Sequence, residues 1–154
     1  MKNAFRKTVI FFVLISILLL FGCGETASAD EMLSEFIYAY GAEGVIYSSE
    51  AKEGEAGYVR DGLTEKIYVY EGNFPQEFAI YLNSHTDSAS ECGVFVCDDA
   101  DEKERVTDMC EKRIDLLGTE NALILRSGNV VFYSTMTDKA RTSEIWKKII
   151  RAHT

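Results

Sequence analysis

Three cysteines in the second half of this 154-residue chain are the side chains best suited to chemistry. Cys92, Cys97 and Cys110 would be metal ligands, disulfide partners or small core residues. Zinc takes four ligands and usually a close pair such as C-x-x-C. Here four residues separate Cys92 from Cys97, and the two histidines, His85 and His153, stand alone. The spacing therefore gives a metal site little support.

A disulfide between Cys92 and Cys110 has better geometric support. If a helix after Cys97 runs back over the strand before it, about 17 Å of strand lies between Cys92 and Cys97, at roughly 3.3 Å per residue. About 16 Å of helix then lies between Asp99 and Cys110, at roughly 1.5 Å per residue. Cys92 and Cys110 would lie level with one another, so a bond between them is one hypothesis. Buried free thiols are the alternative, because cysteine is a common small core residue.

A run of acidic side chains follows the second of these cysteines. It consists of Asp98, Asp99, Asp101, Glu102 and Glu104. Carboxylates bind hard cations, but the run lacks the glycine and the terminal glutamate of the calcium loop. Acidic residues also stabilise a helix N-terminus, and Asp99 with Glu102 matches a capping box. We therefore interpret the run as the start of a helix.

No nucleophile has an evident base beside it. Nucleophilic catalysis requires the two within hydrogen-bond reach, and the chain has only two histidines, of which His153 is penultimate. The 25 acidic residues offer many carboxylate pairs, but no spacing singles one out. The sequence therefore predicts no catalytic residue, no metal and no cofactor.

The N-terminus has the pattern of a secretory signal. Lys2, Arg6 and Lys7 are followed by thirteen residues, 9–21, that are apolar except for Ser16. A basic start before an apolar run of this length is typical of an exported protein. A membrane-spanning helix needs about 20 apolar residues, so the run is short for a span.

The run ends in Leu20-Phe21-Gly22-Cys23, which resembles the bacterial lipobox. The resemblance implies that a diacylglyceryl group joins the Cys23 sulfur and that signal peptidase II cuts after Gly22. Two fatty acyl chains, palmitate among them, suffice for stable anchoring. The mature chain would then sit on the extracytoplasmic face of the cell membrane. A plain cleaved signal and an uncleaved anchor are the alternatives.

The predicted organisation is a signal peptide at 1–22, a tether at 23–29 and one α+β domain at 30–154 with its core at 58–152. Removing three positive charges with the signal from a chain of net charge −9 leaves −12. So acidic a chain lacks the basic footprint that nucleic acid requires. We therefore expect no nucleic-acid partner.

Hydrophobic periodicity predicts the elements of that domain. Helices are expected from Ser28 or Asp30 to Tyr40, over 58–70 (where a strand is the alternative), over 99–117 and over 138–152. Strands are expected over 45–47, 78–82, 92–97, 122–125 and 130–134. The second half thus reads hairpin, helix, hairpin, helix. The simplest packing is a four-stranded antiparallel sheet with helices covering one face.

Three segments carry a family resemblance along with the lipobox: ECGVFVCDD at 91–99, CEKRIDLL at 110–117 and LRSGNVVFYS at 125–134. With them the chain from about Tyr58 onward resembles an uncharacterised domain-of-unknown-function family of Gram-positive lipoproteins. The resemblance implies an α+β domain outside the membrane. It brings no known activity and no catalytic residues.

The leading functional prediction is a membrane-anchored lipoprotein that acts as a binding or accessory module of the cell envelope. Its partner would be an envelope protein or a wall polymer. One alternative is a wall- or peptide-acting hydrolase with a carboxylate site that forms only in three dimensions. The other is a single-lobe solute- or cation-binding lipoprotein, because the chain is too short for a two-lobed receptor.

Overall fold

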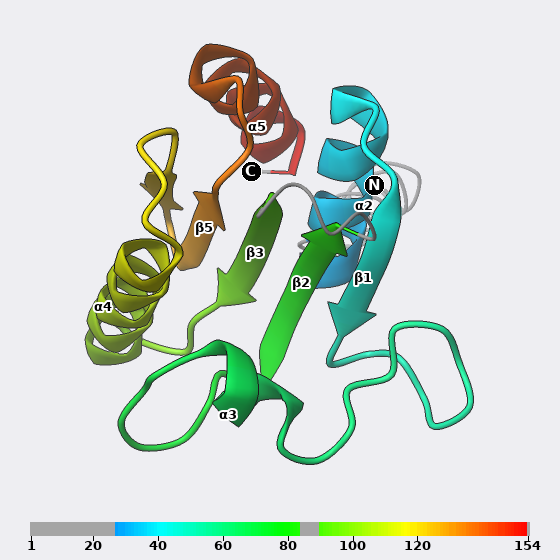
Figure 1. The fold of residues 1–154 in the computed structure, drawn as a ribbon, viewed down its shortest axis with the longest axis vertical. Coiled ribbons are helices and arrows are strands. Elements are labelled where there is room, and N and C mark those ends of the chain that lie inside the picture. The colour runs from blue at the N-terminus through cyan, green and yellow to red at the C-terminus, as the bar shows by residue number, and fades with distance from the viewer. Residues whose placement is uncertain (1–26, 84–89, 154) are drawn as a thin grey trace, which may run out of the picture.

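The computed structural model describes residues 27–83 and 90–153, which form an α+β fold around one open antiparallel sheet (Figure 1). The strands are β1 (Gly44–Ser48), β2 (Glu77–Asn83), β3 (Glu91–Val96), β4 (Leu123–Ser127) and β5 (Val130–Ser134). The helices are α2 (Ala29–Tyr40), α3 (Leu63–Ile67), α4 (Ala100–Leu117) and α5 (Lys139–His153). The predicted α+β class and antiparallel sheet are confirmed.

The sheet has five strands in the order β1-β2-β3-β5-β4, not the four predicted. The two late hairpins share the sheet through β3 and β5, where Val94 lies opposite Phe132. The additional strand is β1, which pairs with β2 from Gly44 opposite Asn83 to Ser48 opposite Ala79. The strand itself was predicted. Its place in the sheet depends on a partner beyond a long loop, which local patterning does not reveal.

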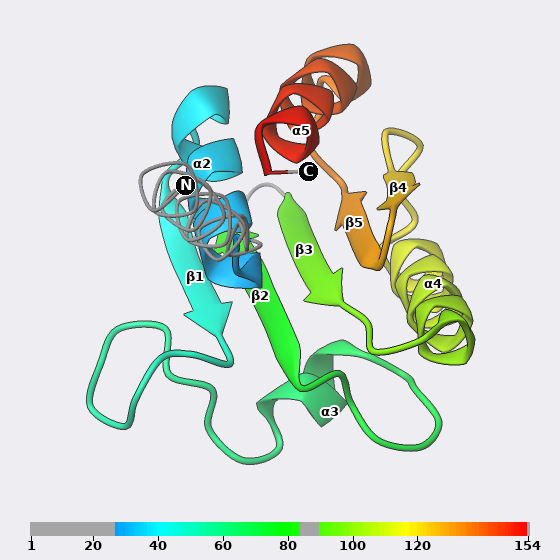
Figure 2. The same cartoon turned by 180° about the vertical axis from the view of Figure 1, so that it is seen from behind.

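Helices cover both faces of the sheet, so the expectation of one covered face was wrong (Figures 1 and 2). The α2–α5 layer lies on one face and contains Phe36, Phe132 and Trp146. The α4 layer lies on the other face and contains Phe95 and Met109. The physical reason is that the central strands carry apolar side chains at both alternations, and both faces must then be buried.

Both ends of α2 have predicted capping residues, Ser28 at the start and Gly41 at the end. The Ser28 hydroxyl accepts a hydrogen bond from the Glu31 N–H while the Glu31 carboxylate accepts one from the Ser28 N–H, which is a complete capping box. Gly41 ends α2 in the left-handed conformation, at φ 72°. α2 begins at Ala29, so the last residues of the expected tether belong to the folded domain.

The segment 58–70 differs from the predicted helix. Only α3 is helical there, because Gly62 has φ 75° and the chain is extended at Tyr68. The apolar side chains of the segment still pack against the α4 layer, with Ile67 and Tyr68 buried. Their spacing therefore reflects which side chains are packed against the core, and it does not indicate a helix over the whole segment.

Residues 1–26 lie outside the described range, and with them the predicted signal peptide and Cys23. Within residues 27–83 and 90–153, no helix combines the length and the apolar character needed to cross a membrane.

Candidate functional site

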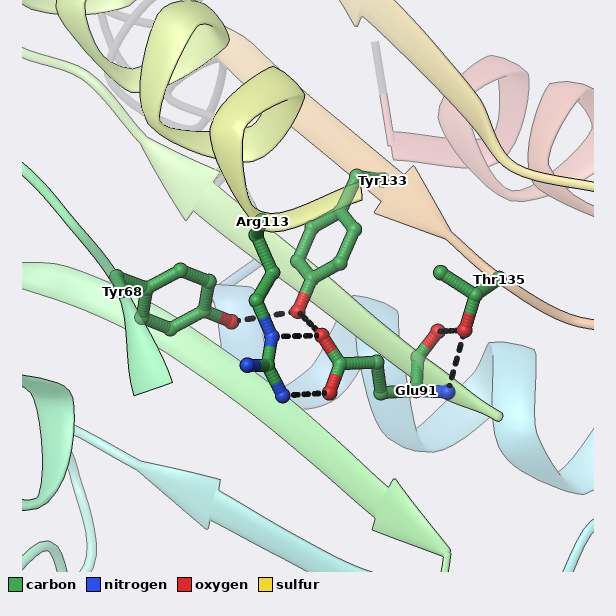
Figure 3. A network of polar contacts seen from close by, with 5 residues as sticks. All are labelled: Tyr68, Glu91, Arg113, Tyr133 and Thr135. Carbon is green, nitrogen blue, oxygen red and sulfur yellow. Dashed lines mark hydrogen bonds and ion pairs between the residues drawn. The ribbon is translucent and has the colours of Figure 1, made fainter. Parts of the chain in front are cut away.

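A buried carboxylate, Glu91, lies at the centre of a polar network that also includes Arg113, Tyr133 and Tyr68 (Figure 3). Glu91 is the first residue of β3, and its side chain lies on the face covered by α4, where Arg113 of α4 contacts it and Phe95 is also buried. Only 4% of the residue is exposed. A buried charge requires a partner of opposite charge and satisfied hydrogen bonds.

Arg113 of α4 supplies that partner in a two-point contact. Its Nε donates to Glu91 Oε1 at 2.7 Å, and its Nη2 donates to Oε2 at 2.6 Å. The Tyr133 hydroxyl donates to the same Oε1 at 2.8 Å. Since that proton points to Glu91, the hydroxyl of Tyr68, 2.7 Å away, donates to Tyr133. Two charge-assisted bonds in parallel are among the strongest polar contacts in proteins.

Burial and hydrogen bonding fix the protonation states of the two tyrosines and Arg113 in this network. Burial raises the pKa of Tyr68 and of Tyr133 well above the usual value. The hydrogen bond to Glu91 raises the pKa of Arg113. Both tyrosines therefore remain neutral donors at physiological pH, and the guanidinium remains charged.

These contacts decide what the network can do. The Glu91 carboxylate already accepts three hydrogen bonds, so it is poorly placed to accept a proton from a substrate. The network instead ties α4, β3 and β5 to the segment after α3. The backbone adds a further tie, since the Glu91 N–H donates to Thr135 Oγ1 at 2.9 Å.

Gly93 makes room for this arrangement. It pairs with Tyr133 across β3 and β5. A Cβ added at Gly93 would overlap the Tyr133 ring and come within 2.9 Å of the Phe95 ring. Glycine at this position therefore lets the Tyr133 ring cross β3 and reach Glu91 without being displaced.

The three cysteines predicted as candidates are buried and free, and the structure does not bring Cys92 and Cys110 together. Cys92 lies in the α2–α5 layer, where its Sγ donates to Ser134 Oγ at 3.3 Å. Cys110 lies in the α4 layer with Cys97, on the other side of the sheet. The hypothetical Cys92–Cys110 bond is not formed, because α4 crosses the face opposite to the one that Cys92 occupies.

Burial also makes these thiols poor nucleophiles. It raises the pKa of Cys92 to about 12 and that of Cys97 to about 11. The pKa of Cys110 is raised well above its ordinary value for the same reason. The thiolate is the reactive form, so all three residues act as core side chains in this structure.

The acidic run after β3 forms the start of α4, as predicted. Asp99 Oδ1 accepts a hydrogen bond from the Glu102 N–H at 2.7 Å, and Glu102 Oε2 accepts one from the Asp98 N–H at 2.6 Å. Within the described residues, no three His, Cys, Asp or Glu side chains gather in a way that would hold a metal ion.

A second candidate is a surface hollow of about 1000 Å³ between β1 and the loop that follows it. We call it the loop hollow. Besides Leu63, its side chains are two tyrosines, three carboxylates and one guanidinium, supplied by Tyr47, Tyr58, Glu53, Glu55, Asp61 and Arg60. It is open to solvent and more polar than apolar, so it would suit a ligand recognised by charge and by aromatic faces.

The loop is held against β1 by its backbone. The Ser48 N–H donates to the Gly57 carbonyl at 3.1 Å, and Ser48 forms an isolated parallel bridge with Tyr58. Gly57 has φ 85°, and a Cβ there would overlap the Ile46 carbonyl oxygen. The close approach therefore needs glycine, and it sets Tyr58 beside the end of β1.

Neither candidate was identified from the sequence. The sequence does hold a signal for the Glu91 network. Glu91 alternates with Gly93 and Phe95 along the strand, and Arg113 follows Met109 by one helical turn. A charged residue in register with buried ones indicates a paired charge. The loop hollow has no comparable signal, since its polar, glycine-rich segment is typical of any loop.

Comparison with protein-family models, with curated proteins and with solved structures found no match for this chain. The resemblance to a family of Gram-positive lipoproteins stays a prediction.

Proposed function

We propose that this chain is a lipid-anchored lipoprotein on the extracytoplasmic face of the cell membrane, where it serves as a binding or accessory module of the envelope. The observation that carries the proposal is the position of Cys23, directly after Gly22 at the end of a basic and then apolar N-terminal segment. A diacylglyceryl group on Cys23 would anchor the chain stably.

Binding is favoured over turnover by the way the described carboxylates are used. The most buried one, Glu91, is engaged by Arg113 and Tyr133 and holds the fold together. The carboxylates of the loop hollow lie instead on an open surface beside two tyrosines. Such a surface suits recognition of an envelope partner, whereas hydrolysis would require a sheltered acid or base with a tuned pKa.

The anchor is tested by following the chain in its own cells. The wild-type chain should fractionate with the membrane and be digested by protease added to intact protoplasts. Cys23→Ala should either leave the membrane or accumulate at the larger, unprocessed size. Thr26→Ala, three residues further on, is the control and should behave as the wild type. A Cys23→Ala chain with unchanged mature size and unchanged membrane retention would refute the proposal.

A further inference from the structure

We infer that the loop hollow binds a primary ammonium group, presented as a lysine side chain by a peptide segment of a partner protein. The inference rests on the proposed binding role and names the chemistry of the ligand. It is carried by three features of the hollow: its charge, its pair of tyrosines and the way the loop is fixed in place.

The charge of the hollow is negative. Glu53, Glu55 and Asp61 line it against the single guanidinium of Arg60. None of the ion pairs found among the described residues joins these three carboxylates to a basic side chain. Three negative charges against one positive charge leave the hollow attractive to a cationic ligand, and a lysine ammonium brings three N–H donors.

The two tyrosines add the second feature. Tyr47 and Tyr58 both line the hollow, one from β1 and one from the returning loop. The faces of aromatic rings attract cations, and clusters of aromatic side chains are a recurrent way of holding an ammonium group. A neutral ligand would gain from the rings but not from the three carboxylates.

The loop is fixed before any ligand arrives. The bond from Ser48 to the Gly57 carbonyl and the close approach of Gly57 to Ile46 hold its returning end. Within the loop, the Lys52 N–H donates to Glu55 Oε2 at 2.8 Å, which sets the position of that carboxylate. A site organised in advance loses less entropy when it binds.

The openness of the hollow favours a lysine carried on a partner's surface. The ammonium group stands at the end of a flexible four-carbon stem, so it can enter the hollow while the peptide backbone stays outside. Exposed carboxylates are screened by salt, and at about 0.5 M ionic strength attraction of this kind is strongly reduced.

The test is a titration of the full chain in detergent micelles, followed by backbone amide NMR. The probe is the capped peptide acetyl-Gly-Lys-Gly-amide, and its Nε-acetylated form is the neutral counterpart. We expect the lysine probe to shift the amides of residues 53–61, and the shifts to disappear when the ammonium is acetylated or when salt is raised to about 0.5 M.

Matched variants locate the site. Asp61→Asn and Tyr58→Leu should each weaken binding at least fivefold. Asp108→Asn on α4 and Tyr38→Leu on α2 remove an exposed carboxylate and an exposed tyrosine elsewhere, and they should leave binding unchanged. Because Asp61 is exposed, its variant should fold normally, which separates lost binding from lost structure.

Three results would overturn the inference: no shifts at 53–61, equal shifts with the acetylated peptide, or shifts produced instead by a neutral N-acetylglucosamine trimer. The readout does not require the lipid. A Cys23→Ala chain that binds the lysine probe would support the inference even if the anchor proposal failed.

Discussion

Replacing Arg113 by leucine should be one of the most damaging single changes in the α4 layer. It removes both guanidinium bonds to Glu91 and leaves a carboxylate, on a side chain that is 6% exposed, with one remaining side-chain donor, Tyr133. Breaking a buried ion pair by deleting one partner costs about 3–5 kcal/mol. The Arg113 side chain is 19% exposed, so we expect a loss of about 3 kcal/mol, near the lower end of that range.

The assay is urea unfolding followed by far-ultraviolet circular dichroism at pH 7. A loss of about 3 kcal/mol is a large fraction of the total stability of a small domain, which is about 5–15 kcal/mol. Glu91→Gln combined with Arg113→Leu should recover part of the loss at pH 7, since the amide is neutral and its oxygen can still accept from Tyr133.

The control breaks an ion pair that is exposed. Lys148 Nζ lies 2.8 Å from Glu144 Oε1, with both side chains about two-thirds exposed or more. Lys148→Ala should leave the urea midpoint nearly unchanged, because exposed pairs are weak. The reasoning is refuted if Arg113→Leu costs less than about 1 kcal/mol, the level of a surface pair, or if the double variant is as unstable as the sum of its two single variants.

Three further predictions concern the core. Gly93→Ala should lower the free energy of unfolding by about 1–3 kcal/mol, as overpacking does, because the new Cβ displaces the Tyr133 ring; an unchanged urea midpoint would contradict this. Cys92, Cys97 and Cys110 should resist iodoacetamide in the folded chain at pH 8 and all react after unfolding without reductant; a mass showing two thiols still blocked would reveal a disulfide. Since burial raises the pKa of Cys92 from 9.0 to about 12, the folded state holds its proton where the unfolded state has lost it, so stability should fall as pH rises from 9 towards 12, by up to about 1.4 kcal/mol per pH unit for this thiol. Cys92→Ala should reduce that slope, and an identical slope would refute the assignment.

The parts of the fold that could be predicted from the sequence are those decided by neighbouring residues. Ser28 with Glu31 and Asp99 with Glu102 indicate helix starts because a side chain can reach an N–H three residues away. The turn Gly128-Asn129 joins two short apolar runs into the hairpin β4–β5. These signals need no knowledge of the rest of the chain.

The parts that were missed depend on contacts between distant segments. The pairing of β1 with β2 and the side of the sheet taken by α4 are set by packing, which no local pattern encodes. A disulfide between Cys92 and Cys110 was considered only because α4 was expected on the face that Cys92 occupies. The apolar side chains at 131, 132 and 133 lie on alternating faces and are all fully buried, so the sequence did hold a sign of a sheet covered on both sides.

The covalent state of Cys23 tests the central claim most directly. The chain should be extracted from membranes of the cells that make it, digested with protease and its N-terminal peptide analysed by mass spectrometry. The account predicts a peptide that begins at Cys23 and carries a diacylglyceryl group on the sulfur. A peptide that joins Gly22 to Cys23, with the Cys23 thiol unmodified, would contradict it.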